Sequence, residues 1–162
     1  MLREQLLNAM GDLKLHGMKS VLDEVLVTGT RQRATPERVL LELLSAEQSE
    51  RKAKSIRYRL GQAKFPVAKD LDQFDFSASP VNEMQVRSLY EGQFLATQSN
   101  VILIGGTGTG KSHLAIAIAR QAIYNGKRCR YFNLVDLSND NLKLTTCDNR
   151  ILTTLSGERK AG

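Results

Sequence analysis

Apolar residues recur at three- and four-residue intervals through the first half of the chain, a spacing typical of amphipathic helices. The first thirty residues carry two such stretches, which Gly17 and Gly29 are expected to punctuate. A further helix is predicted from Thr35, a good N-cap that is followed by proline at the first helical position. Pro66 ends this region, because proline disfavours helical geometry at the residue before it. Residues 1–66 are therefore predicted to form a helical module.

The second half of the chain changes to a pattern of strand, glycine-rich loop, helix and strand. Residues 101–104 are apolar and largely β-branched, which predicts a central parallel strand covered on both faces. The helix after the loop is expected to stop at Gly126, and residues 128–133 are predicted to form the next strand, which completes a right-handed βαβ unit. Between the two halves, residues 71–76 are predicted to form a short edge strand or an extended surface segment, and a helix is expected from about residue 80 to 98.

The loop itself, GGTGTGKS, matches the phosphate-binding P-loop pattern in the strand–loop–helix setting that its chemistry requires. Its glycines allow backbone N–H groups to turn toward phosphate oxygens, and the N-terminus of the following helix adds partial positive charge. Lys111 is predicted to reach the β- and γ-phosphates, and Ser112 to ligate Mg²⁺. The predicted nucleotide site consists of Gly105, Gly106, Thr107, Gly108, Thr109, Gly110, Lys111, Ser112 and His113. The expected cofactors are ATP and Mg²⁺.

His113 follows the loop directly and has two interpretations, a catalytic base or a packing and hydrogen-bonding residue of the first helical turn. The second interpretation is favoured, because a single histidine in a P-loop helix is more often structural. The catalytic residues therefore stay unassigned.

Positive charge is concentrated at the end of the helical module. The chain has a net charge of +6, and six basic residues with no acid among them lie between positions 51 and 64. They are Arg51, Lys52, Lys54, Arg57, Arg59 and Lys64. Two interpretations stay open: a solvated helix face supported by Glu47–Arg51 and Glu50–Lys54 pairs, or a surface that contacts nucleic-acid phosphates.

Composition excludes several classes of protein. Hydrophobic residues make up 41% and charged residues 25% of the chain, which is ordinary for a globular protein. No apolar run approaches the roughly 20 residues that span a bilayer, and the first ten residues carry an acid and amides unlike a signal peptide. A cytoplasmic location is expected. Cys129 and Cys147 are too far apart for a CxxC motif and are expected to be reduced and structural.

Several stretches resemble the ATP-binding helper proteins of insertion-sequence transposition, the IstB type, which are AAA+ ATPases close to the DnaC helicase loaders. The likeness lies in residues 40–44, in residues 63–66, in the Phe-Asp-Phe of residues 71–76, and in the P-loop with its continuation to Ala115. It extends to about Leu137. The resemblance implies a helical module for protein or DNA contacts and an AAA+ core that binds ATP. It also implies a transposase and DNA as partners, and a homo-oligomer when the protein is intact.

The predicted fold is therefore α/β: a helical module at 1–66, an incomplete P-loop NTPase core of AAA+ type at 67–137, and a divergent, weakly structured tail at 138–162. A hydrolytic core also needs a Walker B acid, a sensor residue and an arginine finger, and none appears after the P-loop. We expect ATP binding without turnover, in a truncated or frameshifted copy of the helper ATPase.

Three other functions stay open. A small-molecule P-loop kinase would carry an arginine-rich lid downstream, which this sequence lacks. A non-enzymatic module would bind DNA or a partner through its helices and keep a vestigial P-loop. A fragment of a DnaC-like helicase loader would share the same residues.

Overall fold

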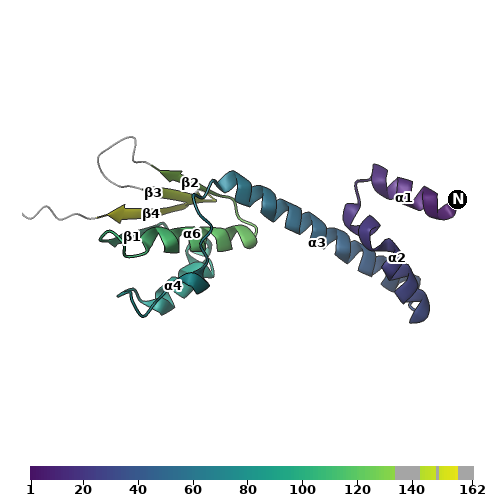
Figure 1. Cartoon of the computed structure of the whole chain (residues 1–162), viewed down its shortest axis with the longest axis horizontal. Helices are drawn as coiled ribbons and strands as arrows, with labels where there is room; N and C mark the ends of the chain where they lie inside the picture. The colour runs from purple at the N-terminus through teal and green to yellow at the C-terminus, as the bar shows by residue number, and fades with distance from the viewer. Residues whose placement is uncertain (134–142, 149, 157–162) are drawn as a thin grey trace, which may run out of the picture. The chain divides into compact units, whose positions relative to one another are not determined.

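The computed structural model describes residues 1–133, 143–148 and 150–156. The chain divides into two compact units, Met1–Arg57 and Tyr58–Gly162 (Figure 1). The division falls inside helix α3 (Pro36–Ala63), ahead of the boundary expected at residue 66. No helix of the described residues is long and apolar enough to cross a membrane.

The first unit contains α1 (Leu2–Asp12), α2 (His16–Arg31) and the first part of α3. Pro36 is the first residue of α3, and the Thr35 hydroxyl oxygen accepts the Arg38 N–H at 3.4 Å, as expected of an N-cap. The helices bury a small apolar cluster that contains Met10, Met18, Leu22 and Leu43. The prediction of a helical N-terminal region is confirmed.

Gly17 and Gly29 lie within α2 and do not punctuate it, so that prediction was wrong. A Cβ added at Gly17 would lie 2.7 Å from both the Ala46 carbonyl oxygen and the Glu47 Cα. A Cβ added at Gly29 would lie 2.8 Å from a methyl group of Val39. Both glycines are therefore sites of close approach between α2 and α3, and the sequence pattern of one helix does not reveal such a contact.

Glu47 of α3 is a buried acid that caps the start of α2. One of its carboxylate oxygens accepts the N–H groups of Gly17 at 2.7 Å and of Met18 at 3.2 Å. The other oxygen accepts the Arg51 Nε–H at 2.7 Å. The hydrogen bond from Arg51 and those from the backbone lower the pKa of Glu47 against the opposing effect of burial. The predicted Glu47–Arg51 pair thus also ties two helices together.

The second unit is built on a four-stranded sheet. Its strands are β1 (Val101–Gly105), β2 (Cys129–Asn133), β3 (Lys143–Cys147) and β4 (Arg150–Ser156), in the order β1-β4-β3-β2. β4 is parallel to β1, and the other neighbours are antiparallel. Strands β3 and β4 lie where a weakly structured tail was expected. Their β-branched threonine and isoleucine residues favour extended structure, which the polar character of the segment concealed.

β1 was predicted to be a central strand covered on both faces, and the structure differs. It is an end strand of the described sheet, and its residues alternate between half-buried and exposed. Ile102 is 58% exposed and Ile104 is 74% exposed. Val101 and Leu103 instead pack in the core clusters beside α6. The strand is apolar on both faces, but the described helices cover only one.

Helix α6 (Lys111–Tyr124) lies between the sheet and α4 (Glu83–Tyr90) (Figure 1). It is buried on most sides, from Leu114 to Ala119 and again at Ala122 and Ile123. The helix ends as predicted, because Gly126 adopts a φ of +88° and the Lys127 N–H bonds to the Ala122 carbonyl.

The helix expected from about residue 80 to 98 is divided in two. Asn82 caps α4, accepting the Gln85 N–H at 3.2 Å, and α5 (Gln93–Ala96) follows. Gly92 separates them because its φ of +91° is left-handed.

Cys129 and Cys147 form a disulfide across β2 and β3. They are directly opposite residues of the antiparallel pair, and both are buried. The expectation that both thiols stay reduced was therefore wrong. It could not be corrected from spacing alone, because β3 had not been predicted and only its register brings the two residues together.

Candidate functional site

The glycine-rich loop connects the end of β1 to the start of α6, in the setting that the sequence predicted. Gly108 and Gly110 have φ values of +77° and +82°, in the left-handed region that favours glycine. Gly110 is the N-cap of α6, and its carbonyl accepts the Leu114 N–H at 3.0 Å. Residues 106–109 are exposed. The loop therefore presents its backbone to solvent at a helix N-terminus, where an anion is favoured.

The side chain of Lys111 folds back over this loop. Its ammonium group donates to the Gly106 carbonyl oxygen and lies 3.3 Å from the Thr109 hydroxyl oxygen. The Thr109 hydroxyl donates to the same carbonyl at 2.9 Å. Ser112 lies half-buried in the first turn of α6. Oxygen atoms of the loop thus hold the Lys111 ammonium group over the loop, where it could donate hydrogen bonds to a bound phosphate.

Residues 70–76, here called the strap, lie against the same helix and contain the 3₁₀ turn η1 (Leu71–Gln73). They were expected to be a strand or an extended surface segment, and they are not a strand. A Cβ added at Gly110 would lie within 3.2 Å of the Phe74 Cζ and closer still to its Cε2. The Phe74 ring also makes an edge contact with the His113 ring, with centroids 5.4 Å apart. The strap therefore contacts the loop directly.

Two polar contacts tie the strap to α6. The Asp70 carbonyl oxygen lies 2.8 Å from His113 Nε2, which must carry the proton because a carbonyl only accepts. The Asp70 carboxylate accepts the Arg120 Nε–H at 3.1 Å. His113 thus has the contacts of a packing and hydrogen-bonding residue. Sequence reasoning missed Asp70, Phe74 and Arg120. The segment that contains Phe74 was noticed for its alternating pattern and its family resemblance, but no contact with the loop was assigned to it.

The six basic residues between positions 51 and 64, five of them in α3 and Lys64 just after its end, do not share one environment. Arg51 bonds to Glu47, and Arg57 lies 3.5 Å from Glu50, in place of the expected Glu50–Lys54 pair. Arg59 donates to the Gly126 carbonyl. The remaining three are exposed and take part in no ion pair of the described residues; they are Lys52, Lys54 and Lys64. The solvated-face interpretation accounts for the paired arginines and leaves the lysines without an intramolecular role.

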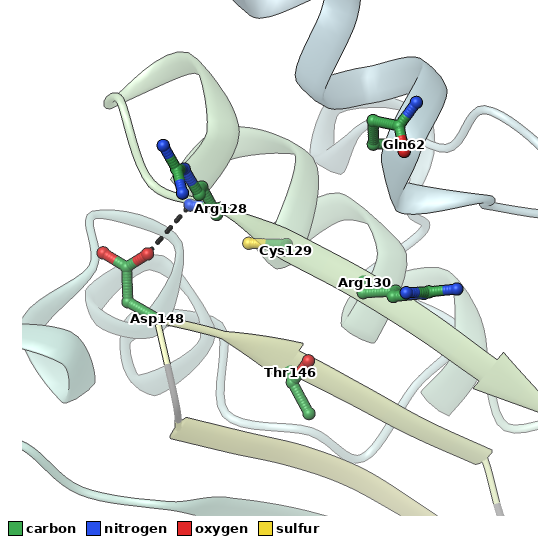
Figure 2. A pocket seen from close by; sticks show the side chains of 6 residues that line it. All are labelled: Gln62, Arg128, Cys129, Arg130, Thr146 and Asp148. Atoms are coloured by element: carbon green, nitrogen blue, oxygen red, sulfur yellow. Dashed lines mark hydrogen bonds between the residues drawn. The ribbon is translucent and has the colours of Figure 1, made fainter.

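A hollow of about 480 Å³ lies at the other end of the sheet (Figure 2). Its lining residues are Gln62, Arg128, Cys129, Arg130, Thr146 and Asp148. Asp148 accepts the Arg128 backbone N–H at 2.9 Å and lies 3.3 Å from the Lys127 ammonium group. The loop follows the C-terminal end of β1, whereas Asp148 lies just before the N-terminal end of β4. Because β1 and β4 are parallel, these two ends lie at opposite edges of the sheet. The hollow and the loop are therefore separate features.

Comparison with known proteins gives one family. The model of IstB-like ATP binding proteins matches residues 8–160. An ATP-binding protein named for insertion sequence IS5376, from Geobacillus stearothermophilus, is 39% identical over 62% of this chain and 40% of its own length. One named for IS21, from Pseudomonas aeruginosa, is 32% identical over 75% of this chain and 46% of its own. One named for IS232, from Bacillus thuringiensis subsp. berliner, is 29% identical over 94% of this chain and 61% of its own length.

The chain spans about half the length of the curated relatives that it matches. The match corrects one expectation, because the likeness was thought to stop near Leu137 and the family model continues to residue 160. The P-loop pattern alone would not have named a family, but the whole-chain match does. The chain belongs to the family of IstB-like ATP-binding proteins.

Proposed function

We propose that the loop from Gly105 to Ser112 binds the triphosphate of ATP together with Mg²⁺. The observation that carries the proposal is the position of the Lys111 ammonium group over an exposed loop that contains two left-handed glycines. Backbone N–H groups and the N-terminus of α6 would attract the phosphates. Relatives named for ATP binding favour ATP as the nucleotide.

Two polar side chains of the loop have a role in this proposal. Lys111 would exchange its contacts with Gly106 and Thr109 for phosphate oxygens, a charge-assisted and therefore stronger set of hydrogen bonds. The Ser112 hydroxyl fits a magnesium ion, which prefers oxygen ligands and retains several waters. The metal would neutralise phosphate charge when bound.

The wider role is proposed from the relatives, which are named for insertion sequences. We infer that the chain acts with a transposase on DNA in the cytoplasm, as an AAA+ type protein that forms homo-oligomers. Lys52, Lys54 and Lys64 support the DNA contact, because they are exposed cations without an ion-pair partner among the described residues. Arg51, Arg57 and Arg59 have intramolecular partners and are weaker candidates.

The test of nucleotide binding is a calorimetric titration of the chain with Mg²⁺-ATP. Lys111→Ala is expected to weaken binding roughly tenfold to a hundredfold, because a hydrogen bond to a charged group contributes about 1.5–3 kcal/mol. Lys54→Ala is the matched control, since it removes one exposed positive charge from the other compact unit. Equal affinities of the wild type and Lys111→Ala would refute the proposal.

Turnover is not part of the proposed function. Among the described residues after Lys111, the only acid is Asp148, at the end of the sheet opposite the loop. We expect phosphate release from this chain to stay at background with Mg²⁺-ATP. A magnesium-dependent turnover abolished by Lys111→Ala would contradict that expectation.

A second candidate function is a DNA-binding module with a vestigial loop. Lys52 and Lys54 of α3, which are exposed and have no ion-pair partner among the described residues, favour it. It predicts DNA retention that survives Lys111→Ala, decreases in Lys52→Ala/Lys54→Ala, and falls steeply with salt.

A further inference from the structure

We propose that Phe74 is a positioning residue for the nucleotide loop: its ring holds Gly110 in place and so preorganises the loop for phosphate. This inference rests on the proposed function and deepens it, because it assigns part of the affinity to a residue that would not touch ATP.

The contact lies where the loop becomes a helix. Gly110 combines a left-handed φ with the N-cap position of α6, and the Phe74 ring fills the space that any side chain at Gly110 would need. The ring thus limits movement of the residue whose carbonyl starts the helical hydrogen bonds. Glycine is required there for two reasons, its backbone conformation and the proximity of the ring.

The ring is itself held firmly. Phe76 contacts it on the strap, with ring centroids 4.9 Å apart, and His113 contacts it from α6. Leu71 anchors the strap in the core, where it is 4% exposed. Asp70 bonds to α6 at His113 and again at Arg120, two turns further along the same side of the helix. A fixed strap therefore places a fixed ring against the loop.

The middle of the loop has hydrogen bonds from Lys111 and Thr109 to the Gly106 carbonyl, but its glycines have no packing comparable to the Phe74 ring. A Cβ added at Gly108 would meet no atom within 4 Å, and one at Gly106 would meet only the Thr109 methyl group at 4.0 Å. Glycine loses more conformational freedom than other residues when it is ordered. Because the described packing against the loop's glycines lies at the Gly110 end, releasing that end would increase the disorder that phosphate binding has to remove.

The experiment compares Phe74→Ala, Phe74→Tyr and Phe65→Ala in the full chain with the wild type and Lys111→Ala. Phe74→Ala is expected to weaken Mg²⁺-ATP binding roughly tenfold, the effect of ordering about one further backbone residue. Phe74→Tyr keeps the ring and is expected to bind within about twofold of wild type. Phe65→Ala is the matched control, because its ring contacts Tyr131 and not the loop.

A second measurement does not depend on nucleotide. Hydrogen exchange of the nucleotide-free chain is expected to accelerate in the peptide containing residues 106–110 in Phe74→Ala, and to stay unchanged there in Phe65→Ala. Loss of fold in Phe74→Ala would move the comparison to Phe74→Leu, which fills more of the space without an aromatic edge, and the same two results are expected.

The outcomes separate the two proposals. Equal binding by wild type and Lys111→Ala overturns the proposed function, and the exchange measurement then still tests the contact of Phe74 with the loop. Binding that is lost in Lys111→Ala but unchanged in a folded Phe74→Ala or Phe74→Leu, with unchanged loop exchange, overturns only the positioning role. Equal weakening by Phe65→Ala overturns it as well, because the effect would then be a general loss of packing.

Discussion

Replacing Gly17 with alanine tests how closely α2 approaches α3. The added Cβ would lie 2.7 Å from the Ala46 carbonyl oxygen and the Glu47 Cα, and 2.9 Å from the Glu50 Cβ. Ordinary contact begins near 3.4 Å, so the helices would have to separate by about 0.7 Å. Two of the three atoms belong to the backbone, which cannot rotate away. That shift would also lengthen the hydrogen bonds from the start of α2 to Glu47.

The magnitude follows from two opposing effects. Overpacking a close contact costs about 1–3 kcal/mol. Alanine in place of glycine in a helix returns up to about 1 kcal/mol. Because two of the contacted atoms are backbone atoms, the upper part of the overpacking range applies, about 2–3 kcal/mol. The net destabilisation expected is about 1–2 kcal/mol, opposite in sign to the usual effect of Gly→Ala in a helix.

The assay is urea unfolding followed by circular dichroism at 222 nm. Gly11→Ala is the matched control in the same unit, because an added Cβ there meets nothing within 4 Å. It is expected to leave stability unchanged or to raise it by up to about 1 kcal/mol. A Gly17→Ala midpoint equal to or above that of the wild type would refute the close approach of the two helices.

Three further predictions concern other parts of the chain. Because folding lowers the pKa of Glu47, the ionised carboxylate stabilises the fold above the ordinary pKa of 4.5, and this stabilisation is lost as pH falls through the lower pKa of the folded state. Below about pH 4.5, the melting temperature should therefore fall more steeply with pH in the wild type than in Glu47→Gln. Reducing the disulfide between Cys129 and Cys147, which are 18 residues apart, should cost about 3 kcal/mol in urea unfolding. Two freely labelled thiols in unreduced, denatured protein would disprove the bond. Ile104→Thr should change the free energy of unfolding by less than about 0.5 kcal/mol, because the Ile104 side chain is 74% exposed. A loss of about 2 kcal/mol or more, the size expected for a buried isoleucine, would show that this face of β1 is covered.

The glycine-rich loop was predictable because its requirements are local. Glycines, a lysine and a hydroxyl follow one another between an apolar strand and an amphipathic helix, and each has a physical reason to stand there. The ends of the flanking helix were predictable for the same reason, since Gly126 supplies the left-handed residue that a helix end favours. Pro36 marked the start of α3 in a similar way.

Features that depend on residues far apart in the chain were not predictable. Phe74 reaches Gly110 only because the strap folds back along α6, and no periodicity of either segment indicates that contact. The partial exposure of β1 depends on which helices cover the sheet, whereas an apolar strand has the same sequence whether one face or two are buried. The role of Gly17 depends on where α3 lies, so its sequence context suggested a helix break instead.

The pairing of β1 with β4 has a consequence for the order in which the chain folds. Val101 lies opposite Leu152 and Gly105 opposite Ser156. The strand that leads into the glycine-rich loop therefore pairs, among the described residues, with β4, which lies about fifty positions later in the chain. A parallel pair this far apart in sequence closes slowly, because the entropy of the intervening loop is lost before the contacts form. During synthesis, the loop and α6 emerge before that partner exists. Nucleotide affinity should accordingly be among the last properties to appear as the chain folds.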